Sequence, residues 1–541
     1  MSIDENNKEA GSETAVANSR SLVMRAAGLV GVAVLLSRIV GLVREIVIRA
    51  NLGITTLPAE AYEIAVRFPE TIFLIIAGGA IGSAFIPTFA AYFEQGDSEG
   101  GWRLFSNVIN LLTVVVTAVS LLSILFAPQL VTWLAGEKVA NNPELLPLTV
   151  RLMRIMLISP IIFGASGVIM GALNARQHFL LPALAPTIYN VGIIAGGLLW
   201  PGSQPEEVAF GFAGGAVVGA AGHFLVQLPG LWRKEARYTA VLNLHDPGVR
   251  QVMRLMAPRV LGLSFSEINK FLIILLTDPM ATGSLPALNT AFRLIIMPQG
   301  IIGQALGIAA FPTLSSLAAR GEKAEMRQIF ADSLRILLFL GLPFSVVFAI
   351  LGQPIVSFLF ERGILGDEGT LFVSWALLFY ALGLVPLLAL EVVARTFYAL
   401  SDTLTPVLAG GVQIVIMWLL SLWFSQTVFP QLGWLPLGGL ALGFSLSNVI
   451  EVLLLLWLLR RKLGGIQGYA LLNGLWRMGV ATLLMAGGMW LVQGWLVETA
   501  VLLHLMLVSV AGGLIYVLVC AGLRLEELNG LWQYGRRRLN W

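Results

Sequence analysis

One stretch near the N-terminus, residues 24–51, constrains the fold more than any other part of the sequence. It reads MRAAGLVGVAVLLSRIVGLVREIVIRAN, which is apolar and longer than the roughly 20 residues that a helix needs to cross a bilayer. Arg38 lies at its middle, and Arg44, Glu45 and Arg49 follow. A guanidinium at bilayer depth costs about 2.5–3.5 kcal/mol even on a lenient insertion scale. We therefore expect these arginines to face water or an anion inside a bundle of helices.

The composition supports a membrane setting for the whole chain. Of 541 residues, 57% are hydrophobic and only 12% are charged, whereas soluble domains carry about 25% charged residues. We predict an all-α polytopic membrane protein in which residues 1–20 form a disordered cytoplasmic tail. The hydrophobic runs predict fourteen crossings, near 24–50, 60–93, 103–134, 147–173, 180–200, 207–231, 252–277, 286–317, 328–360, 370–399, 405–425, 436–459, 472–494 and 499–522.

The distribution of Lys and Arg predicts the orientation. With the N-terminus in the cytoplasm, the loops on the outer side hold only Lys138 and Arg362, and the other loop cations lie inside. The C-terminal segment 524–541 then forms a basic cytoplasmic tail. Its RRR run at 536–538 is interpreted as a juxtamembrane anchor near anionic lipid, so no nucleic-acid partner is expected.

An internal repeat divides the chain into two similar halves. VMRAAGLVGVAVLLSRI (23–39) aligns with VMRLMAPRVLGLSFSEI (252–268), and GGAIGSAFIPTF (78–89) with GQALGIAAFPTL (303–314). Both halves start inside and hold an even number of crossings, so they are predicted to be parallel six-helix repeats that form two lobes about a central site. The predicted domains are an N-lobe at 21–232, a C-lobe at 248–460 and two additional C-terminal helices at 470–523.

Charged residues concentrate on the first two helices of each repeat. The alignment pairs Arg38 with Glu267, so these side chains are expected to face one another across the cavity. Converging guanidinium groups grip phosphate or pyrophosphate bidentately. The pair Glu391 and Arg395, spaced i, i+4, is interpreted first as structural. The candidate substrate-binding residues are Arg38, Arg44, Arg49, Glu60, Arg67, Glu267 and Arg293.

The sequence contains no catalytic triad, nucleotide-binding glycine loop or metal-ligand cluster, so no enzyme activity, metal or cofactor is expected. Coupling to the membrane potential or to an ion is left open, since QIVIMWLLSLWF (413–424) carries no acid. The single cysteine, Cys520, is interpreted as a small apolar residue of the last helix.

Several motifs, in order along the chain, resemble those of the MurJ (MviN) lipid II flippases of the MOP (multidrug/oligosaccharidyl-lipid/polysaccharide) exporter superfamily. They are SRIVGLVRE (37–45), AFIPTFAAY (84–92), LNARQHFLLPALAPTIYN (173–190), HDPG (245–248), FRLIIMPQGIIGQALGIAAFPTLS (292–315), PIVSFLFERG (354–363) and FYALSDTLTP (397–406). The resemblance covers nearly the whole chain and agrees with the count of fourteen helices.

This resemblance implies a V-shaped transporter in which the two additional helices form a groove for the undecaprenyl tail, while the cationic cavity takes the pyrophosphate-linked head. Lipid II would move from the inner to the outer leaflet of the bacterial plasma membrane by alternating access, in support of peptidoglycan biosynthesis, cell wall biogenesis and cell shape. Arg38, Arg44 and Arg293 would bind the substrate, and Glu60 stands where relatives carry aspartate. Lipid II, membrane lipids and cell-wall synthases are the implied partners.

The chain departs from the family pattern at two places. Relatives carry an arginine pair where this chain reads ETIFLIIAGG (70–79), and an acid where it has Ile296. Arg67 or Arg49 would then substitute for the missing arginines. Two alternatives stay open: a flippase for another polyprenyl-linked glycan, and a drug or cation antiporter of the same superfamily.

Overall fold

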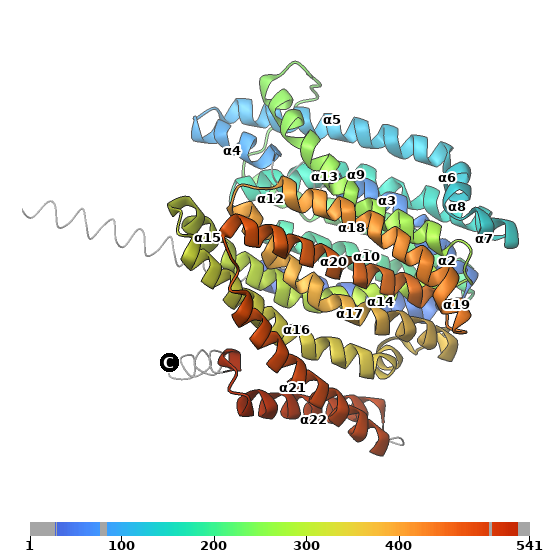
Figure 1. The fold of residues 1–541 in the computed structure, drawn as a ribbon. Coiled ribbons are helices and arrows are strands. Elements are labelled where there is room, and N and C mark those ends of the chain that lie inside the picture. Colours follow the sequence, from blue (N-terminus) through green and yellow to red (C-terminus); the bar gives the residue numbers. More distant parts are fainter. Residues whose placement is uncertain (1–27, 29, 76–83, 497–499, 529–541) are drawn as a thin grey trace, which may run out of the picture. The chain divides into compact units, whose positions relative to one another are not determined.

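The structure is a computed structural model that describes residues 28, 30–75, 84–496 and 500–528 (Figure 1). These residues form helices and connecting turns, with no strand among them, which confirms the predicted all-α class. The chain divides into two compact units: residues 1–52 with 61–267, and residues 53–60 with 268–541. The predicted lobe boundaries and the groove at 470–523 stay predictions.

The first unit begins with a helix at residues 30–52. The boundary between the units falls within α2 and again within α13. The helices of this part of the chain are α2 (Leu57–Ala65), α3 (Arg67–Phe73), α4 (Ile86–Glu94), α5 (Ser98–Leu125), α6 (Ala127–Leu134), α7 (Gly136–Asn141), α8 (Leu145–Met156), α9 (Ile158–Ala175), α10 (Leu180–Leu199), α11 (Pro205–Leu225), α12 (Leu228–Arg233) and α13 (Pro247–Thr277).

The second unit contains the remaining helices, two of which include a π-helical turn. They are α14 (Ser284–Pro298), η2 (Gln299–Gly303), α15 (Gln304–Arg320), α16 (Lys323–Phe360), α17 (Gly366–Ala399), α18 (Leu404–Trp423), η3 (Phe424–Val428), α19 (Phe429–Gln431), α20 (Leu437–Leu463), α21 (Gly468–Trp495) and α22 (Val501–Gly522). Within this unit α17 packs against α14, α15, α16 and α20, and so forms its centre. Helix α16 also packs against α21 and α22.

Proline explains where two of the long apolar stretches break. A proline has no N–H to bond to the carbonyl four residues earlier, and its ring clashes with that carbonyl. Helix α2 ends just before Val66, three residues ahead of Pro69. Helix α5 ends at Leu125, and α6 begins two residues later with Pro128 in its first turn. Both breaks therefore lie within a turn of a proline, at Pro69 and Pro128.

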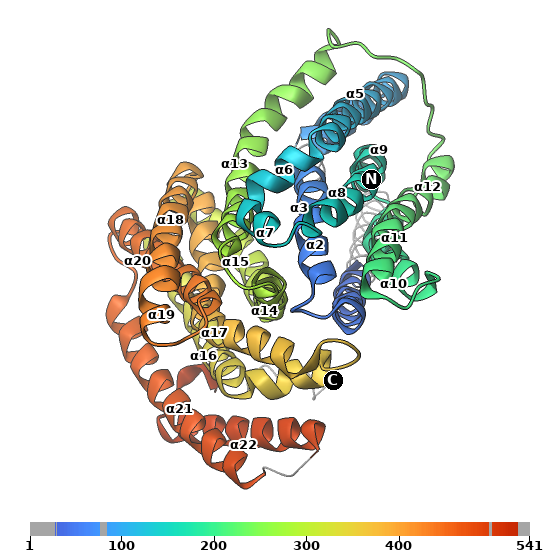
Figure 2. The same cartoon turned by 90° about the vertical axis from the view of Figure 1, so that its right-hand side faces the viewer.

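Glycines allow α10 and α11 to lie in close contact in the first unit (Figure 2). A Cβ on Gly196 would lie 2.4 Å from the carbonyl oxygen of Gly211 and 2.4 Å from Cα of Gly215. A Cβ on Gly192 would lie 2.3 Å from Cα of Gly219. The backbones therefore touch along the crossing, as small residues permit in membrane helix pairs.

Eleven helical segments in the described residues are long and apolar enough to cross a membrane. Three predicted crossings are not among them: 24–50 and 60–93, which lie partly outside the described residues, and 252–277. All three carry more charged residues than the other predicted crossings. In α13, for example, Arg250, Arg254 and Lys270 interrupt the apolar run. The chain is thus a multi-pass membrane protein, and the total of fourteen crossings stays a prediction.

Candidate functional site

Arg44 has an uncharged partner. Its Nη1 donates a hydrogen bond to Oδ1 of Asn190, on α10, at 2.9 Å. Arg44 is half-buried and Asn190 is buried. The buried Nε of Arg44 has no hydrogen-bond partner among the described residues, and no carboxylate among them forms an ion pair with Arg44. The charge of Arg44 is therefore held in place by a dipole and is not neutralised by an acid.

Arg49 lies in the opposite environment. It is fully buried, and its Nε donates to Oε1 of Glu45 at 2.8 Å while Nη2 forms an ion pair with Glu63. Both carboxylates are buried as well, so one cation lies between two anions. The charge of Arg49 is therefore compensated within this group, and removing Arg49 would leave two carboxylates buried without a cation.

The acidic candidates are buried and hydrogen-bonded. Oε2 of Glu60 accepts from the backbone N–H of Gly283 at 2.8 Å within the second unit. Gly283 has φ +97°, where a side chain would be strained, and its Cβ would lie 2.8 Å from Cα of Thr55. In the first unit, Oε2 of Glu267 accepts from the hydroxyl of Thr71 at 2.6 Å.

The remaining candidate cations are distributed over both units. Arg67 is buried, and its Nη1 lies 3.4 Å from Oε2 of Glu70. Arg38 in the first unit and Arg293 on α14 in the second are each half-buried. The predicted cavity shared by Arg38, Arg44 and Arg293 stays a prediction, and so does the predicted pairing of Arg38 with Glu267 across it.

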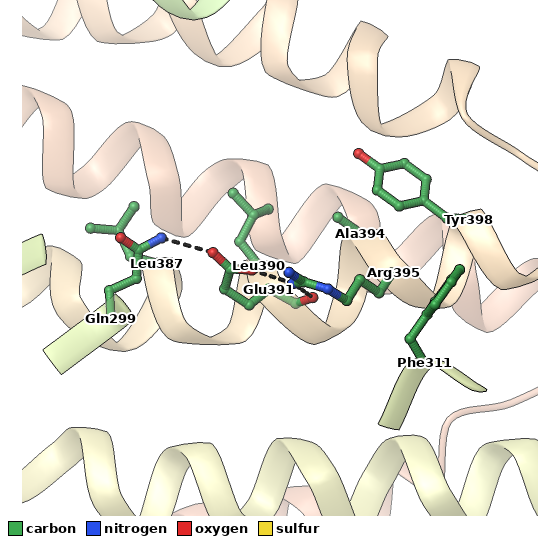
Figure 3. Close-up of a pocket in the computed structure, with 8 residues that line it drawn as sticks. All are labelled: Gln299, Phe311, Leu387, Leu390, Glu391, Ala394, Arg395 and Tyr398. Carbon is green, nitrogen blue, oxygen red and sulfur yellow. Dashed lines mark hydrogen bonds and ion pairs between the residues drawn. The ribbon is translucent and has the colours of Figure 1, made fainter. Parts of the chain in front are cut away.

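A pocket of about 400 Å³ in the second unit contains the other polar cluster (Figure 3). Glu391 forms an ion pair with Arg395 and accepts a hydrogen bond from Nε2 of Gln299 at 3.0 Å. Gln299 is the first residue of the π-helical turn η2, and such turns are frequent at functional sites. A Cβ on Gly307 would lie 2.6 Å from Nη1 of Arg395, so this glycine makes room for the guanidinium.

Hydrogen bonds between uncharged polar side chains connect α13, α18 and α20 in the same unit. Nδ2 of Asn269 donates to Oε1 of Gln413 at 3.3 Å, and Nε2 of Gln413 donates to the hydroxyl of Ser447 at 2.9 Å. These hydrogen bonds were not predicted from the sequence because their members carry no charge. Gln413 within the otherwise apolar stretch 413–424 was the available signal.

Eleven membrane-length helices and cations held at depth define a multi-pass membrane transporter. Solved structures match the fold. An inward-facing MATE family multidrug transporter of the MOP superfamily has a TM-score of 0.67 at 14% identity, and covers 80% of this chain and 96% of its own. A solved structure of the lipid II flippase MurJ in an inward closed conformation has a TM-score of 0.75 at 22% identity, with coverage of 91% and 98%. At such identities these matches show the fold.

The sequence comparisons give the family. The family model for the lipid II flippase MurJ matches residues 49–511, and the chain belongs to this family. The lipid II flippase MurJ of Burkholderia cenocepacia is 29% identical over 434 residues, which cover 79% of this chain and 82% of the relative. A probable lipid II flippase MurJ of Rhizobium meliloti is also 29% identical, with 86% of each chain covered. The resemblance inferred from the motifs is confirmed.

Proposed function

We propose that this protein moves lipid II, the undecaprenyl-pyrophosphate-linked peptidoglycan precursor, from the inner to the outer leaflet of a bacterial plasma membrane. The observation that carries the proposal, beside family membership, is the half-buried Arg44 held by Asn190. A guanidinium without a carboxylate partner keeps its charge and its N–H groups for an incoming phosphate. Arg38 and Arg293 are assigned to the same headgroup because of the family resemblance, as half-buried cations.

The transport step follows from charge. A diphosphate headgroup in a low-dielectric interior is unfavourable unless cations and N–H donors replace its water. In the proposed cycle the guanidinium groups supply the positive charge and the N–H donors on one side of the membrane. The two lobes then change their relative tilt, and water replaces the guanidinium groups around the diphosphate on the other side. The undecaprenyl tail stays in lipid, along the α21–α22 pair. Arg49, already neutralised by Glu45 and Glu63, holds helices together and does not contact substrate.

The proposal includes several finer assignments. Both termini lie in the cytoplasm, the membrane is the plasma membrane, and the chain performs no covalent chemistry and carries no cofactor. The cycle is coupled to the membrane potential or to an ion. Cell-wall synthases that consume lipid II are the expected protein partners.

Depletion is the direct test of the substrate. When the protein is removed from a cell that depends on it, lipid II should accumulate on the inner leaflet, measured as the ratio of inaccessible to externally accessible precursor. Accumulation of a different polyprenyl-linked glycan would favour the alternative flippase reading. The antiporter reading is disfavoured because Glu45 and Glu63 are occupied by Arg49 and do not form an open cation site.

Complementation tests the residues. We expect Arg38→Ala, Arg44→Ala and Arg293→Ala each to fail as the sole copy although the protein inserts in normal amount. Arg151→Ala is the matched control, because this arginine is exposed and its contacts with Glu206, the carbonyl oxygen of Pro147 and the ring of Phe210 lie at the surface. Normal growth of the Arg38 and Arg44 variants would contradict the proposal.

A further inference from the structure

Uncharged polar side chains from two other helices meet Arg44 in the first unit. The first helix contributes Arg44, α2 contributes Tyr62, and α10 contributes Tyr189 and Asn190. Arg44 bonds to Oδ1 of Asn190, and a Cβ on Gly41, three residues before Arg44, would lie 3.7 Å from Nδ2 of the same asparagine. One face of the first helix therefore packs against α10 at Asn190.

Both tyrosines lie close enough to Arg44 for its charge to act on their hydroxyl groups. Other aromatic side chains hold the two rings. Tyr62 contacts Phe212 with the ring centroids 6.1 Å apart, and Tyr189 contacts Phe163 at 5.0 Å, both in an edge-to-face arrangement. These contacts fix the rings on α2 and α10, so both hydroxyl groups stay within the field of the guanidinium.

The donors of this group are not paired with one another. Tyr62 is only 4% exposed and Asn190 only 8%, yet the hydroxyl of Tyr62 and Nδ2 of Asn190 have no hydrogen-bond partner among the residues that the structure describes. The hydroxyl of Tyr189 and Nε of Arg44 have none there either. A buried tyrosine usually finds a partner for its hydroxyl, and an unpaired buried donor costs free energy. Unpaired donors gathered around one cation point to acceptors that a ligand supplies.

The acids near these tyrosines are already paired with other cations. Glu63 forms an ion pair with Arg49, and Oε2 of Glu70 lies 3.4 Å from Nη1 of Arg67. Arg49 and Arg67 were expected to replace the arginines that this chain lacks, but each has a carboxylate partner. The donors that remain for an anion beside Arg44 are therefore uncharged.

We propose that Tyr62 and Tyr189 are further substrate-binding residues, whose hydroxyl groups donate hydrogen bonds to the phosphate oxygens that Arg44 binds. A diphosphate offers acceptors and negative charge and no carbon-bound apolar surface of its own, so it satisfies the unpaired donors and the guanidinium together. A phenol keeps its proton at neutral pH and so acts as a donor. The inference rests on the proposed function for the identity of the ligand, and deepens it by assigning two neutral donors to the diphosphate.

Tyr62→Phe and Tyr189→Phe test the two hydroxyl groups, because phenylalanine keeps the ring contact and removes only the oxygen. The purified full-length protein is titrated in detergent with labelled lipid II and with undecaprenyl diphosphate. We expect each variant to raise Kd for both lipids about tenfold, which is the size of a lost hydrogen bond to a charged group. Binding of undecaprenol, which has no phosphate, should not change. Tm should not fall, because neither hydroxyl has a partner in the described part of the protein.

Tyr92→Phe is the matched control. This tyrosine of α4 belongs to the same unit and is partly buried, and its hydroxyl also has no hydrogen-bond partner among the described residues, but it lies near Asp97 and Asp246. Its Kd values should equal those of the wild type.

Three outcomes would overturn the inference: an unchanged Kd in both Tyr62→Phe and Tyr189→Phe, an equal loss of affinity in Tyr92→Phe, or an equal loss of affinity for undecaprenol. The proposed function fails separately. If both variants lose affinity for undecaprenyl diphosphate but depletion of the protein does not cause lipid II to accumulate, only the proposed function is refuted.

Discussion

Nη1 of Arg44 donates a hydrogen bond to Oδ1 of Asn190 at 2.9 Å, across 146 positions of sequence. An amide, not a carboxylate, therefore orients this guanidinium of the first helix. An amide accepts the hydrogen bond without cancelling the charge. This choice of partner separates Arg44 from Arg49, which lies only five residues further along the chain between two acids.

Asn190→Asp tests whether that charge is used. The new carboxylate should pair with Arg44 and neutralise it, so binding of lipid II should fall by about tenfold or more, since a charge-assisted hydrogen bond contributes about 1.5–3 kcal/mol. Binding can be measured with the purified protein and labelled lipid II. Asn190→Ala is the matched control and should weaken binding less, because Arg44 keeps its charge. Stronger binding by the aspartate variant would exclude a role for Arg44 as an anion ligand.

Arg49→Ala should destabilise the protein and not merely inactivate it. Removing the cation leaves Glu45 and Glu63 buried together, at a cost of about 3–5 kcal/mol. The expected outcome is a low yield of folded protein and a lower Tm in detergent. Adding Glu45→Gln and Glu63→Gln to an Arg49→Met background should recover much of the loss. If Arg49→Ala alone kept the wild-type Tm, the triad would not be a structural element.

Gly196→Ala should weaken the contact between α10 and α11. The new methyl group would meet the backbone of Gly211 and Gly215 at 2.4 Å, and backbone cannot move aside as a flexible side chain can. We expect a loss of about 1–3 kcal/mol in the free energy of unfolding. Gly214→Ala on α11 is the control, because its Cβ would meet nothing within 4 Å. Equal effects of the two variants on Tm would contradict this account.

The ion pair of Glu391 with Arg395 should contribute mainly to stability. Both side chains are partly exposed, and Gln299 also bonds to Glu391. Arg395→Met should lower stability by about 1–2 kcal/mol, and adding Glu391→Gln should restore most of it, because the pair is neutral overall. Thermal unfolding of the single and double variants measures this. Full stability with lost transport in the double variant would assign the pair a direct role in transport.

Asp402, in the turn between α17 and α18, predicts a pH dependence. Partial burial raises the pKa of its carboxyl group, but hydrogen bonds from Lys462 and Thr405 outweigh this effect and lower the pKa to about 2. A lowered pKa means that the stabilisation is present above the unfolded value of about 3.9 and is lost as the pH falls towards 2.

We therefore expect Asp402→Asn to lower Tm at about pH 6, and the gap to the wild type to narrow between about pH 4 and pH 2. Lys462→Met should reproduce part of the effect, since the hydrogen bonds from Thr405 remain. A gap that stayed constant over this range would show that the carboxylate charge does not contribute.

Much of the helical architecture could be predicted from the local sequence. Over the residues that the structure describes, each predicted crossing corresponds to one or more helical segments, because a run of apolar residues must form backbone hydrogen bonds internally in a bilayer. The helix breaks near Pro69 and Pro128 could also be predicted from the sequence, because proline disrupts the backbone hydrogen bond of its own helical turn. The π-helical turn at Gln299–Gly303 could not be predicted from the local sequence, because it depends on how α14, α15 and α17 pack.

The spacing of the arginines along the helix did not predict which of them remains available to bind an anion. Arg44 and Arg49 belong to one helix and both appeared as candidate ligands. The structure gives one an amide from α10 and the other a carboxylate from α2 in addition to its own Glu45. Partners far apart in sequence are chosen by packing, and no periodicity within the helix encodes them.

The sequence by itself determined the class of this protein, its family and the positions at which charge enters the membrane, because hydrophobic length, proline and motif order act locally along the chain. Only the tertiary structure decided which of those charges are neutralised, as for Arg49 between Glu45 and Glu63, and which are merely oriented, as for Arg44 by Asn190. In a medium of low dielectric constant the difference between a carboxylate and an amide neighbour changes what a guanidinium can bind, and that neighbour is set by the fold.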